Sequence, residues 1–294
     1  NMRPFPAINY SNNAVALNEG AAQWTYTELR QHIDRLASGL LGKARDLKEE
    51  RIAFFMPASV NYVATLLGIW RAGGIAVPLN IAAAMPEIEH ALSCAKVTRL
   101  VVGISSPAES LTPLFSLCRG LNIEVLNFSD VLSDKIMVMP ELDIERRAMM
   151  LFTSGTTNKP KGVVTTHKNI RAQITTLLEA WNWQVEDSIP LFLPLHHIHG
   201  IINVLCCALW IGARVTLFAR FDMGTILARV EDRDYSVFMA VPTIYVKIIG
   251  ELEKLPEPRR KRICTGFKDM RLNISGSAAC PVKLYNQWKE LTGQ

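Results

Sequence analysis

The chain has 294 residues, enough for one large or two ordinary domains, and 49% of them are hydrophobic, enough to fill a sizeable core. Its formal net charge of +5 is mild and the basic residues are scattered, which suits an anionic small molecule and does not indicate a nucleic-acid partner. The six cysteines form no C-x-x-C pair and do not cluster with histidines, which excludes a zinc-finger type of site and a small disulfide scaffold.

The cysteines and the apolar segments bear on where the protein resides. Most cysteines lie in apolar surroundings, which predicts buried free thiols in a reducing compartment. The N-terminal residues lack the charged start and apolar run of a signal peptide. The longest uncharged segment runs from Ser188 to Ala213, but Pro190, Pro194 and three histidines interrupt it, which leaves less than the ~20 apolar residues that a bilayer requires. We therefore expect a cytoplasmic protein without a membrane span.

The first half of the chain alternates short apolar strands with helices. Pro86, followed by acidic residues, is typical of a helix start, and the charged segment 129–147 is expected to be an irregular connection. A strand–helix–strand order predicts a parallel sheet flanked by helices. The expected strands are Ile52–Phe55, Ile75–Val77, Leu100–Val102 and Ile123–Leu126, and the expected helices are Ser59–Trp70 and Pro86–Ala95.

The same alternation continues in the second half. We expect an α/β fold of two stacked subdomains, with mostly parallel sheets flanked by helices, in approximate portions 1–147 and 148–294. The basic run Arg259–Arg262 follows two prolines and is expected to be a solvated loop or helix start rather than a surface for RNA or membrane. The expected strands are Met149–Thr153, Gly162–Thr165, Ile189–Leu193, Arg214–Phe218, Val237–Ala240 and Met270–Ile274, and the expected helices are Lys168–Trp181, Ile201–Trp210, Thr225–Arg233, Pro242–Lys254 and Pro281–Leu291.

The most informative segment is Leu151–Gly162, an apolar strand that breaks into a hydroxyl-rich loop with two glycines and a Lys-Pro-Lys run. Hydroxyls and backbone N–H groups beside glycine can donate to phosphate oxygens, and the lysines add positive charge. A Walker A loop needs Gly, four residues and Gly-Lys-Ser/Thr, which this order does not match. A polar surface turn is the alternative. The predicted phosphate-binding residues are Thr153, Ser154, Gly155, Thr156, Thr157 and Lys161.

The loop resembles the phosphate-binding signature of the adenylate-forming superfamily of acyl-CoA synthetases, luciferases and peptide-synthetase adenylation domains. One departure is Asn158, where the family usually has Gly, and Asn visits positive φ more readily than other non-glycine residues. The resemblance runs from about Trp24 to Gln294. The other segments that are similar to family motifs are Trp70–Gly74, Val77–Asn80, Leu193–Gly200, Val241–Tyr245 and Ile274–Ala279.

The resemblance implies the fold of the family's large N-terminal domain, and it implies that the chain is an N-terminal fragment. In the family, a Tyr-Gly-x-Thr-Glu motif whose Glu holds Mg²⁺ follows shortly after the segment that matches Gln294. A ribose-binding Asp, a β-rich subdomain and a C-terminal domain with a catalytic Lys come later. The resemblance therefore implies no metal ligand within this chain, and it implies that these residues alone are inactive.

The family activates a carboxylic acid with ATP, expels pyrophosphate, and passes the acyl group from the acyl-adenylate to the thiol of coenzyme A. The resemblance implies ATP, Mg²⁺ and coenzyme A, with Lys161 at the departing pyrophosphate and His197 beside the carboxylate and α-phosphate. His196 and His199 flank His197, and for them packing and binding roles both stay open. The implied lining of the acyl and adenine pocket is His197, Val241, Thr243, Lys247, Ser275, Gly276, Ser277 and Ala278.

The motif combination most resembles malonyl-CoA synthetases, in which a basic residue at the position of Lys247 and a hydroxyl at that of Ser277 meet the distal carboxylate. Lys247 follows Thr243 by four residues, so a helix from Pro242 places both on one face. The resemblance thus favours malonate or another short dicarboxylic acid. The alternatives are a solvent-facing Lys247 in a medium- or long-chain fatty acyl-CoA synthetase, and a non-catalytic nucleotide-binding module.

Overall fold

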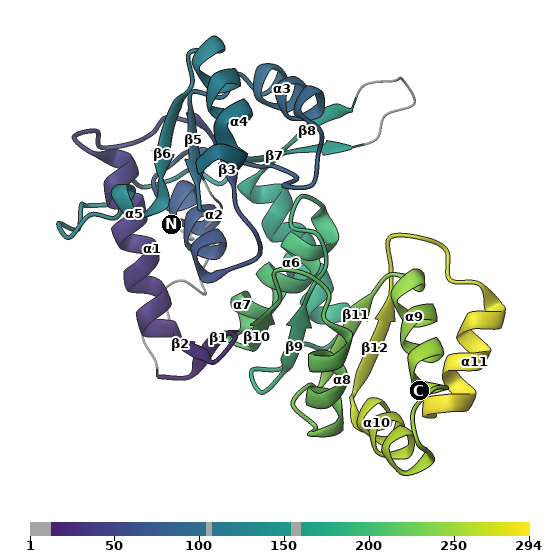
Figure 1. Ribbon diagram of the computed structural model, residues 1–294. Coiled ribbons are helices and arrows are strands. Elements are labelled where there is room, and N and C mark those ends of the chain that lie inside the picture. The colour runs from purple at the N-terminus through teal and green to yellow at the C-terminus, as the bar shows by residue number, and fades with distance from the viewer. Residues whose placement is uncertain (1–12, 104–107, 154–159) are drawn as a thin grey trace.

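The computed structural model describes residues 13–103, 108–153 and 160–294 (Figure 1). Within them the strands form a six-stranded sheet in the order β6-β5-β3-β4-β7-β8, a four-stranded sheet in the order β2-β1-β10-β9, and the parallel pair β11-β12. This is the predicted α/β fold.

The strands are β1 (Val15–Glu19), β2 (Ala22–Thr25), β3 (Arg51–Phe55), β4 (Ile75–Pro78), β5 (Arg99–Val102), β6 (Glu124–Asn127), β7 (Arg147–Thr153), β8 (Lys161–Thr166), β9 (Ser188–Leu191), β10 (Arg214–Leu217), β11 (Val237–Ala240) and β12 (Leu272–Ser275). The helices are α1 (Tyr26–Leu41), α2 (Val60–Arg71), α3 (Met85–Cys94), α4 (Ala108–Gly120), α5 (Phe128–Val131), α6 (His167–Ala180), the π-helix η2 (His199–Cys206), α7 (Cys207–Ile211), α8 (Met223–Glu231), α9 (Pro242–Leu252), α10 (Glu257–Asp269) and α11 (Val282–Thr292).

The six-stranded sheet is covered by helices on both faces. Along β3, Ile52 and Phe54 belong to the core that includes α1 and α2, whereas Ala53 and Phe55 belong to a second core beneath α3 and α4. Figure 1 shows the two helix pairs on opposite sides of this sheet. Parallel strands that are buried on both faces read as continuous apolar runs, which explains why the sequence located them.

Helices α6, η2 and α7 join the six-stranded sheet to the four-stranded sheet. Helix α6 packs on β8, η2 and α7, while η2 contacts β9 and α7 contacts β10. Ile174 of α6 and Leu205 of η2 lie in the same core as Met149 of β7 and Val215 of β10. Figure 1 shows α6 and α7 between the two sheets, so one shared core holds them together.

The sheets are divided differently from the predicted portions 1–147 and 148–294. Strands β7 and β8 complete the first sheet, where Ala76 of β4 pairs with Met149 of β7. Strands β1 and β2 lie in the second sheet, where Leu17 of β1 pairs with Val215 of β10. Each portion therefore contributes strands to the sheet of the other.

The predicted helix Ile201–Trp210 begins earlier than expected, at His199, and its first turns are the π-helix η2. A Cβ on Gly200 would lie 2.7 Å from the carbonyl oxygen of Pro194, so only glycine allows the helix to start this close to the preceding loop. π-Turns inside helices are frequent at functional sites.

The basic run Arg259–Arg262 lies in the first turns of α10. The sequence analysis expected either a solvated loop or a helix start, and the structure shows the helix start. Arg259 and Arg262 both pair with Glu231 of α8, at 3.2 and 2.6 Å, and Lys261 pairs with Glu257 at 2.6 Å. These ion pairs are at the surface, where each contributes about 1 kcal/mol at most. The run therefore serves to seat α10 on α8.

The cysteines in the described part of the chain are all free thiols. Cys118, Cys206 and Cys207 are buried as predicted, and burial raises the pKa of Cys118 to about 11 and that of Cys207 to about 12. Cys264 is half-buried, and Cys94 and Cys280 are exposed, so half of the six cysteines are buried rather than most of them. Among the described residues, every helix is too short or too polar to span a bilayer.

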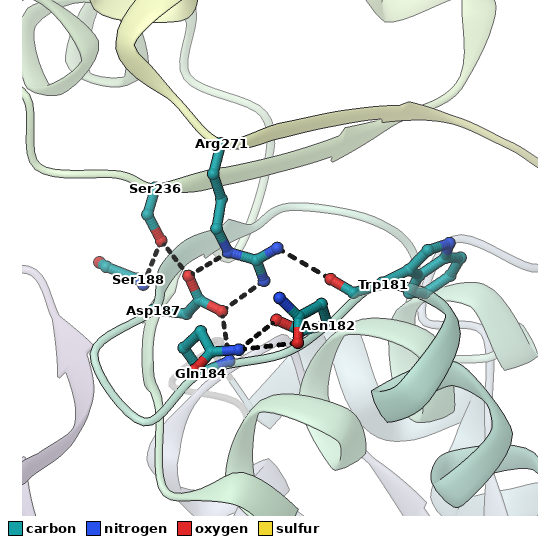
Figure 2. A network of polar contacts seen from close by, with 7 residues as sticks. All are labelled: Trp181, Asn182, Gln184, Asp187, Ser188, Ser236 and Arg271. Carbon is teal, nitrogen blue, oxygen red and sulfur yellow. Dashed lines mark hydrogen bonds and ion pairs between the residues drawn. The ribbon is translucent and has the colours of Figure 1, made fainter.

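A network around Asp187 joins the amino ends of β9, β11 and β12 (Figure 2). Arg271, before β12, donates to the Asp187 carboxylate through Nε at 2.8 Å and Nη2 at 2.5 Å. Ser236, before β11, donates to the same carboxylate at 2.6 Å, and its oxygen accepts the backbone N–H of Ser188 in β9 at 3.0 Å. Burial raises the pKa of Asp187, but the hydrogen bonds from Arg271, Ser236 and the Gln184 amide outweigh it and hold that pKa below its usual value. One carboxylate thus sets the register of three strands.

The Asp187 network predicts a large loss of stability when its cation is removed. Arg271→Met leaves the buried carboxylate without a counter-charge, and we expect the free energy of unfolding to fall by on the order of 3 kcal/mol. Urea titration measures this fall. The control is Lys168→Met, because the Lys168–Glu145 pair is exposed at both ends and exposed pairs contribute about 1 kcal/mol or less. Equal losses in the two variants would contradict a structural role for the network.

His167, at the start of α6, is a buried histidine whose imidazole packs edge-on against Trp70 with ring centroids 6.0 Å apart. Burial, with a smaller contribution from the charge of Arg146, lowers the pKa of His167 from 6.5 to about 4. The folded protein therefore holds this ring neutral, while the unfolded chain takes up a proton as the pH falls below 6.5. Stability is lost as the pH falls from 6.5 toward 4.

Replacing His167 should remove this part of the acid sensitivity. Between pH 7.5 and pH 5 the histidine costs the folded state about 2 kcal/mol, since each pH unit below the unfolded pKa costs about 1.4 kcal/mol. In His167→Phe, which keeps an aromatic ring against Trp70, the free energy of unfolding should fall by about 2 kcal/mol less over this range. Denaturant titrations at both pH values provide the measurement. A His167→Phe protein as acid-sensitive as the wild type would refute the assignment.

Candidate functional site

The predicted acyl and adenine segments lie at the carboxyl ends of β11 and β12. These strands are parallel, and Ala240 pairs with Ser275 at their ends. Val241 then directly precedes α9, while Gly276 follows β12 and donates its N–H to the Ala240 carbonyl at 3.1 Å. Carboxyl ends of parallel strands meet at one edge of a sheet, and such an edge is where α/β proteins bind ligands.

His199 closes this edge from η2. Its Nδ1 lies 2.8 Å from the hydroxyl oxygen of Ser277, and a Cβ on Gly276 would lie 2.8 Å from the His199 ring. Ser277 is exposed and has a left-handed backbone with φ of 64°, which is unusual for serine. The structure thus brings together His199, Gly276 and Ser277 from two distant motifs. Sequence analysis left His199 open between packing and binding, and the available signal was its place in the family motif Leu193–Gly200, hereafter the second motif.

The histidines of the second motif differ in exposure. His199 is buried and burial lowers its pKa, while burial and the charge of His197 lower the pKa of His196 to about 4. The rings of His196 and His197 are adjacent, with centroids 4.1 Å apart, and His197 is exposed. His196 and His199 are therefore neutral hydrogen-bonding groups at neutral pH, and His197 is the histidine open to a ligand.

A buried tyrosine on α2, a helix that covers the first sheet, positions the second motif. Tyr62 of α2 donates its hydroxyl to the carbonyl of Leu195, directly before His196, at 2.6 Å. Burial raises the pKa of Tyr62 well above its usual value, so this hydroxyl stays protonated and remains a donor. Helix α2 thus holds the loop that carries the histidines through this hydrogen bond.

The described ends of the predicted phosphate loop face each other across two antiparallel strands. Thr153 ends β7 and Lys161 begins β8, and the two residues are paired partners. Both are exposed, so the hydroxyl and the ammonium group are open to solvent. Ser154, Gly155, Thr156 and Thr157 lie outside the described residues, and their role in binding phosphate stays a prediction.

The predicted pocket residues Thr243 and Lys247 lie on α9. Thr243 and Lys247 are both exposed on one face of the helix, and Lys247 lines a groove of about 590 Å³ between α8, α9 and the start of α10. Tyr245, on the opposite face, anchors α9 by donating to the Ile274 carbonyl of β12 at 2.7 Å. In the described part of the chain, the side-chain hydrogen bond of Ser277 is with His199, and Lys247 forms no ion pair.

Two further predicted residues, Ser275 and Ala278, lie at or beyond the end of β12. Ala278 is exposed, and the buried hydroxyl oxygen of Ser275 has no hydrogen-bond partner among the described residues. The described residues also contain no cluster of three His, Cys, Asp or Glu side chains that could hold a metal ion.

The sequence model of the AMP-binding enzyme family matches residues 7–294, so the chain belongs to the AMP-binding enzyme family. Its relatives include the mitochondrial malonate–CoA ligase ACSF3 of Xenopus laevis, 35% identical over 95% of this chain and 51% of the relative. The human protein of the same name is 33% identical over 95% of this chain and 51% of its own length. The chain therefore spans about half the length of these curated relatives.

Solved structures agree with this assignment. A malonyl-CoA ligase in a ternary product complex with methylmalonyl-CoA and AMP has a TM-score of 0.82 and 26% identity, covering 99% of this chain and 59% of that one. The fold alone is shared with apo MatB from Rhodopseudomonas palustris, at a TM-score of 0.83 and 21% identity over 99% of this chain and 58% of that one. The fold is also shared with the N-terminal subdomain of Klebsiella oxytoca NpsA, solved in complex with 3-hydroxybenzoyl-AMSN. The TM-score is 0.78 and the identity 18%, over 95% of this chain and 66% of that one.

Proposed function

We propose that the protein is an ATP-dependent acid–CoA ligase that works through an acyl-adenylate and acts on malonate or another short dicarboxylic acid. Family membership supports the reaction class, and the names of the malonate–CoA ligases among the relatives support the acid. The observation that carries the proposal is the His199–Ser277 pair at the carboxyl ends of the parallel strands. It offers two hydrogen-bonding groups that converge where the superfamily would hold its acid.

On the phosphate side, the exposed Thr153 and Lys161 fit the terminal phosphates of ATP. The hydroxyl donates a hydrogen bond, and the ammonium group neutralises charge as pyrophosphate departs. Mg²⁺ would supply further charge neutralisation on the phosphates when it is bound. The exposed His197 donates to the negative charge that develops between the carboxylate and the α-phosphate.

On the acid side, the neutral His199 and the Ser277 hydroxyl are suited to orient a carboxylate, and Lys247 is the cation that would attract its charge. The unpaired Ser275 hydroxyl offers one more hydrogen bond to a ligand. A charged carboxylate that leaves water needs such donors, because an uncompensated buried charge is costly. Lys247 lines the α8–α9 groove, so its part in this site requires the acid to approach that groove.

A second candidate function, a medium- or long-chain fatty acyl-CoA synthetase, is favoured by the same groove. Phe221, Leu227 and Leu255 line it beside Lys247, and together they offer apolar surface to an alkyl chain. The two candidates differ in the use of Lys247, since a fatty acid carries no distal charge for it to meet.

The compartment of the protein stays a prediction. We propose a reducing compartment on the basis of the free thiols, and the cytoplasm is the one that the sequence suggested. The frog and human relatives are named as mitochondrial proteins, so fractionation of cells that express the tagged protein would decide between the two compartments.

Nucleotide binding tests the proposal on the 294-residue chain itself. We expect the chain to bind ATP, and Lys161→Ala to raise the Kd for ATP roughly ten- to hundredfold, because a hydrogen bond to a charged group contributes about 1.5–3 kcal/mol. AMP has only the α-phosphate, so its Kd should change little. Calorimetry measures both, with the exposed Lys168→Ala as control. Acyl-CoA formation by these residues alone should stay at background, and a chain that binds neither nucleotide would overturn the proposed function.

Acid selection is tested in the full-length gene product. Lys247→Met should lower kcat/KM for malonate roughly ten- to hundredfold, the scale of losing one charge-assisted hydrogen bond, and should leave butyrate nearly unchanged. Lys254→Met is the matched control, because Lys254 lines the same groove but pairs with Glu251 at 3.4 Å. Pyrophosphate release with malonate, butyrate and octanoate gives the three rates. Preference of the wild type for octanoate would favour the fatty acyl candidate.

A further inference from the structure

A histidine outside the family motifs reaches the base of the phosphate loop. The Nε2 atom of His90, on α3, lies 2.7 Å from the carbonyl oxygen of Pro160. A carbonyl oxygen only accepts hydrogen bonds, so Nε2 must carry the hydrogen and donate it. Because the next residue is Lys161, this bond fixes the peptide unit that leads directly into the phosphate-binding lysine.

The same imidazole also contacts the other strand of the loop base. The His90 ring packs edge-on against Phe152, with centroids 6.1 Å apart and planes at 72°. Phe152 is paired with Gly162, where an added Cβ would lie 3.3 Å from the Phe152 ring and 3.1 Å from the sulfur of Met150. Gly162 therefore leaves room for the ring that His90 packs on, and His90 touches both strands where the loop begins and ends.

The contact lies beside the second motif. A small cavity of about 40 Å³ is lined by His90, Phe152, Pro160 and His196, together with the end of β4 and the first turns of α3. Its size is that of a few water molecules at most. The base of the phosphate loop, helix α3 and the loop that carries the histidines thus line the same cavity. A shift of Pro160 would therefore change the position of Lys161 relative to His196.

We propose that His90 is a positioning residue for the phosphate loop. Its Nε2–H holds the Pro160 carbonyl so that Lys161 stands opposite Thr153, ready for the terminal phosphates of ATP. His90 itself touches no phosphate in this role and acts through Lys161. The inference rests on the proposed function for its ligand, whereas the hold on Pro160 can be measured without any ligand.

Hydrogen exchange tests the hold on the loop base. In His90→Phe, which keeps a ring against Phe152 and removes the donor, the amides of residues 161–164 should exchange about two- to tenfold faster, the factor for one net hydrogen bond. His90→Gln restores a donor and should return exchange close to the wild-type rate. The matched control is His32→Phe, because His32 also contacts an oxygen through Nε2, that of Asn61 at 3.2 Å, and also lies between aromatic rings.

Nucleotide affinity separates positioning from a general loss of structure. His90→Phe should weaken ATP binding about two- to tenfold and leave AMP unchanged, and His90→Gln should restore ATP binding, while His32→Phe should alter neither. Unchanged exchange in His90→Phe, equal losses for ATP and AMP, or failure of Gln to rescue would each overturn the role. A wild-type chain that binds no ATP would instead contradict the proposed function, and the exchange data would still report whether His90 holds Pro160.

Discussion

The carboxylate of Asp187 is the constraint on which the alignment of β9, β11 and β12 depends. It binds groups from the starts of β11 and β12 while it stands at the start of β9, and so it sets how far each strand reaches toward the opposite edge. Strands of four residues leave little freedom between one end and the other. The meeting of His199 with Ser277 is therefore decided by contacts at the far end of the sheet. A buried acid that is bound on all sides can hold such a register because moving it would strand its charge.

The candidate site draws its parts from both sheets, and each part is held by a hydrogen bond to backbone. Tyr62 fixes the histidine loop, His90 fixes the phosphate loop base, and Tyr245 fixes α9 against β12. Each donor comes from a helix, and each acceptor is a backbone carbonyl of a strand or of the loop that follows or precedes one. Such contacts preserve geometry while the side chains that face the ligand remain free to bind it.

The sequence predicted the buried strands and most helices because parallel strands covered on both faces are apolar along their whole length. It missed β1, β2, α1, α4 and α5, although Thr25 and Glu28 form a capping box that marks the start of α1. Motif resemblance supplied His197, Lys161 and Ser277, and the spacing of Thr243 and Lys247 correctly placed both on one face of α9. Which groove that face borders depends on α8, and the reach of His90 depends on how α3 packs. Both the groove beside α9 and the contact of His90 with Pro160 depend on tertiary packing, which no local pattern in the sequence predicts.

The pairing of β1 with β10 has a consequence for the synthesis of the chain. Asn18 and its partner Thr216 are 198 residues apart, so β1 leaves the ribosome long before the strand that completes its ladder exists. During that interval the β1–β2 hairpin has an open edge, and open edges recruit foreign strands. The edge of β1 is therefore without its partner strand until β10 has been synthesised.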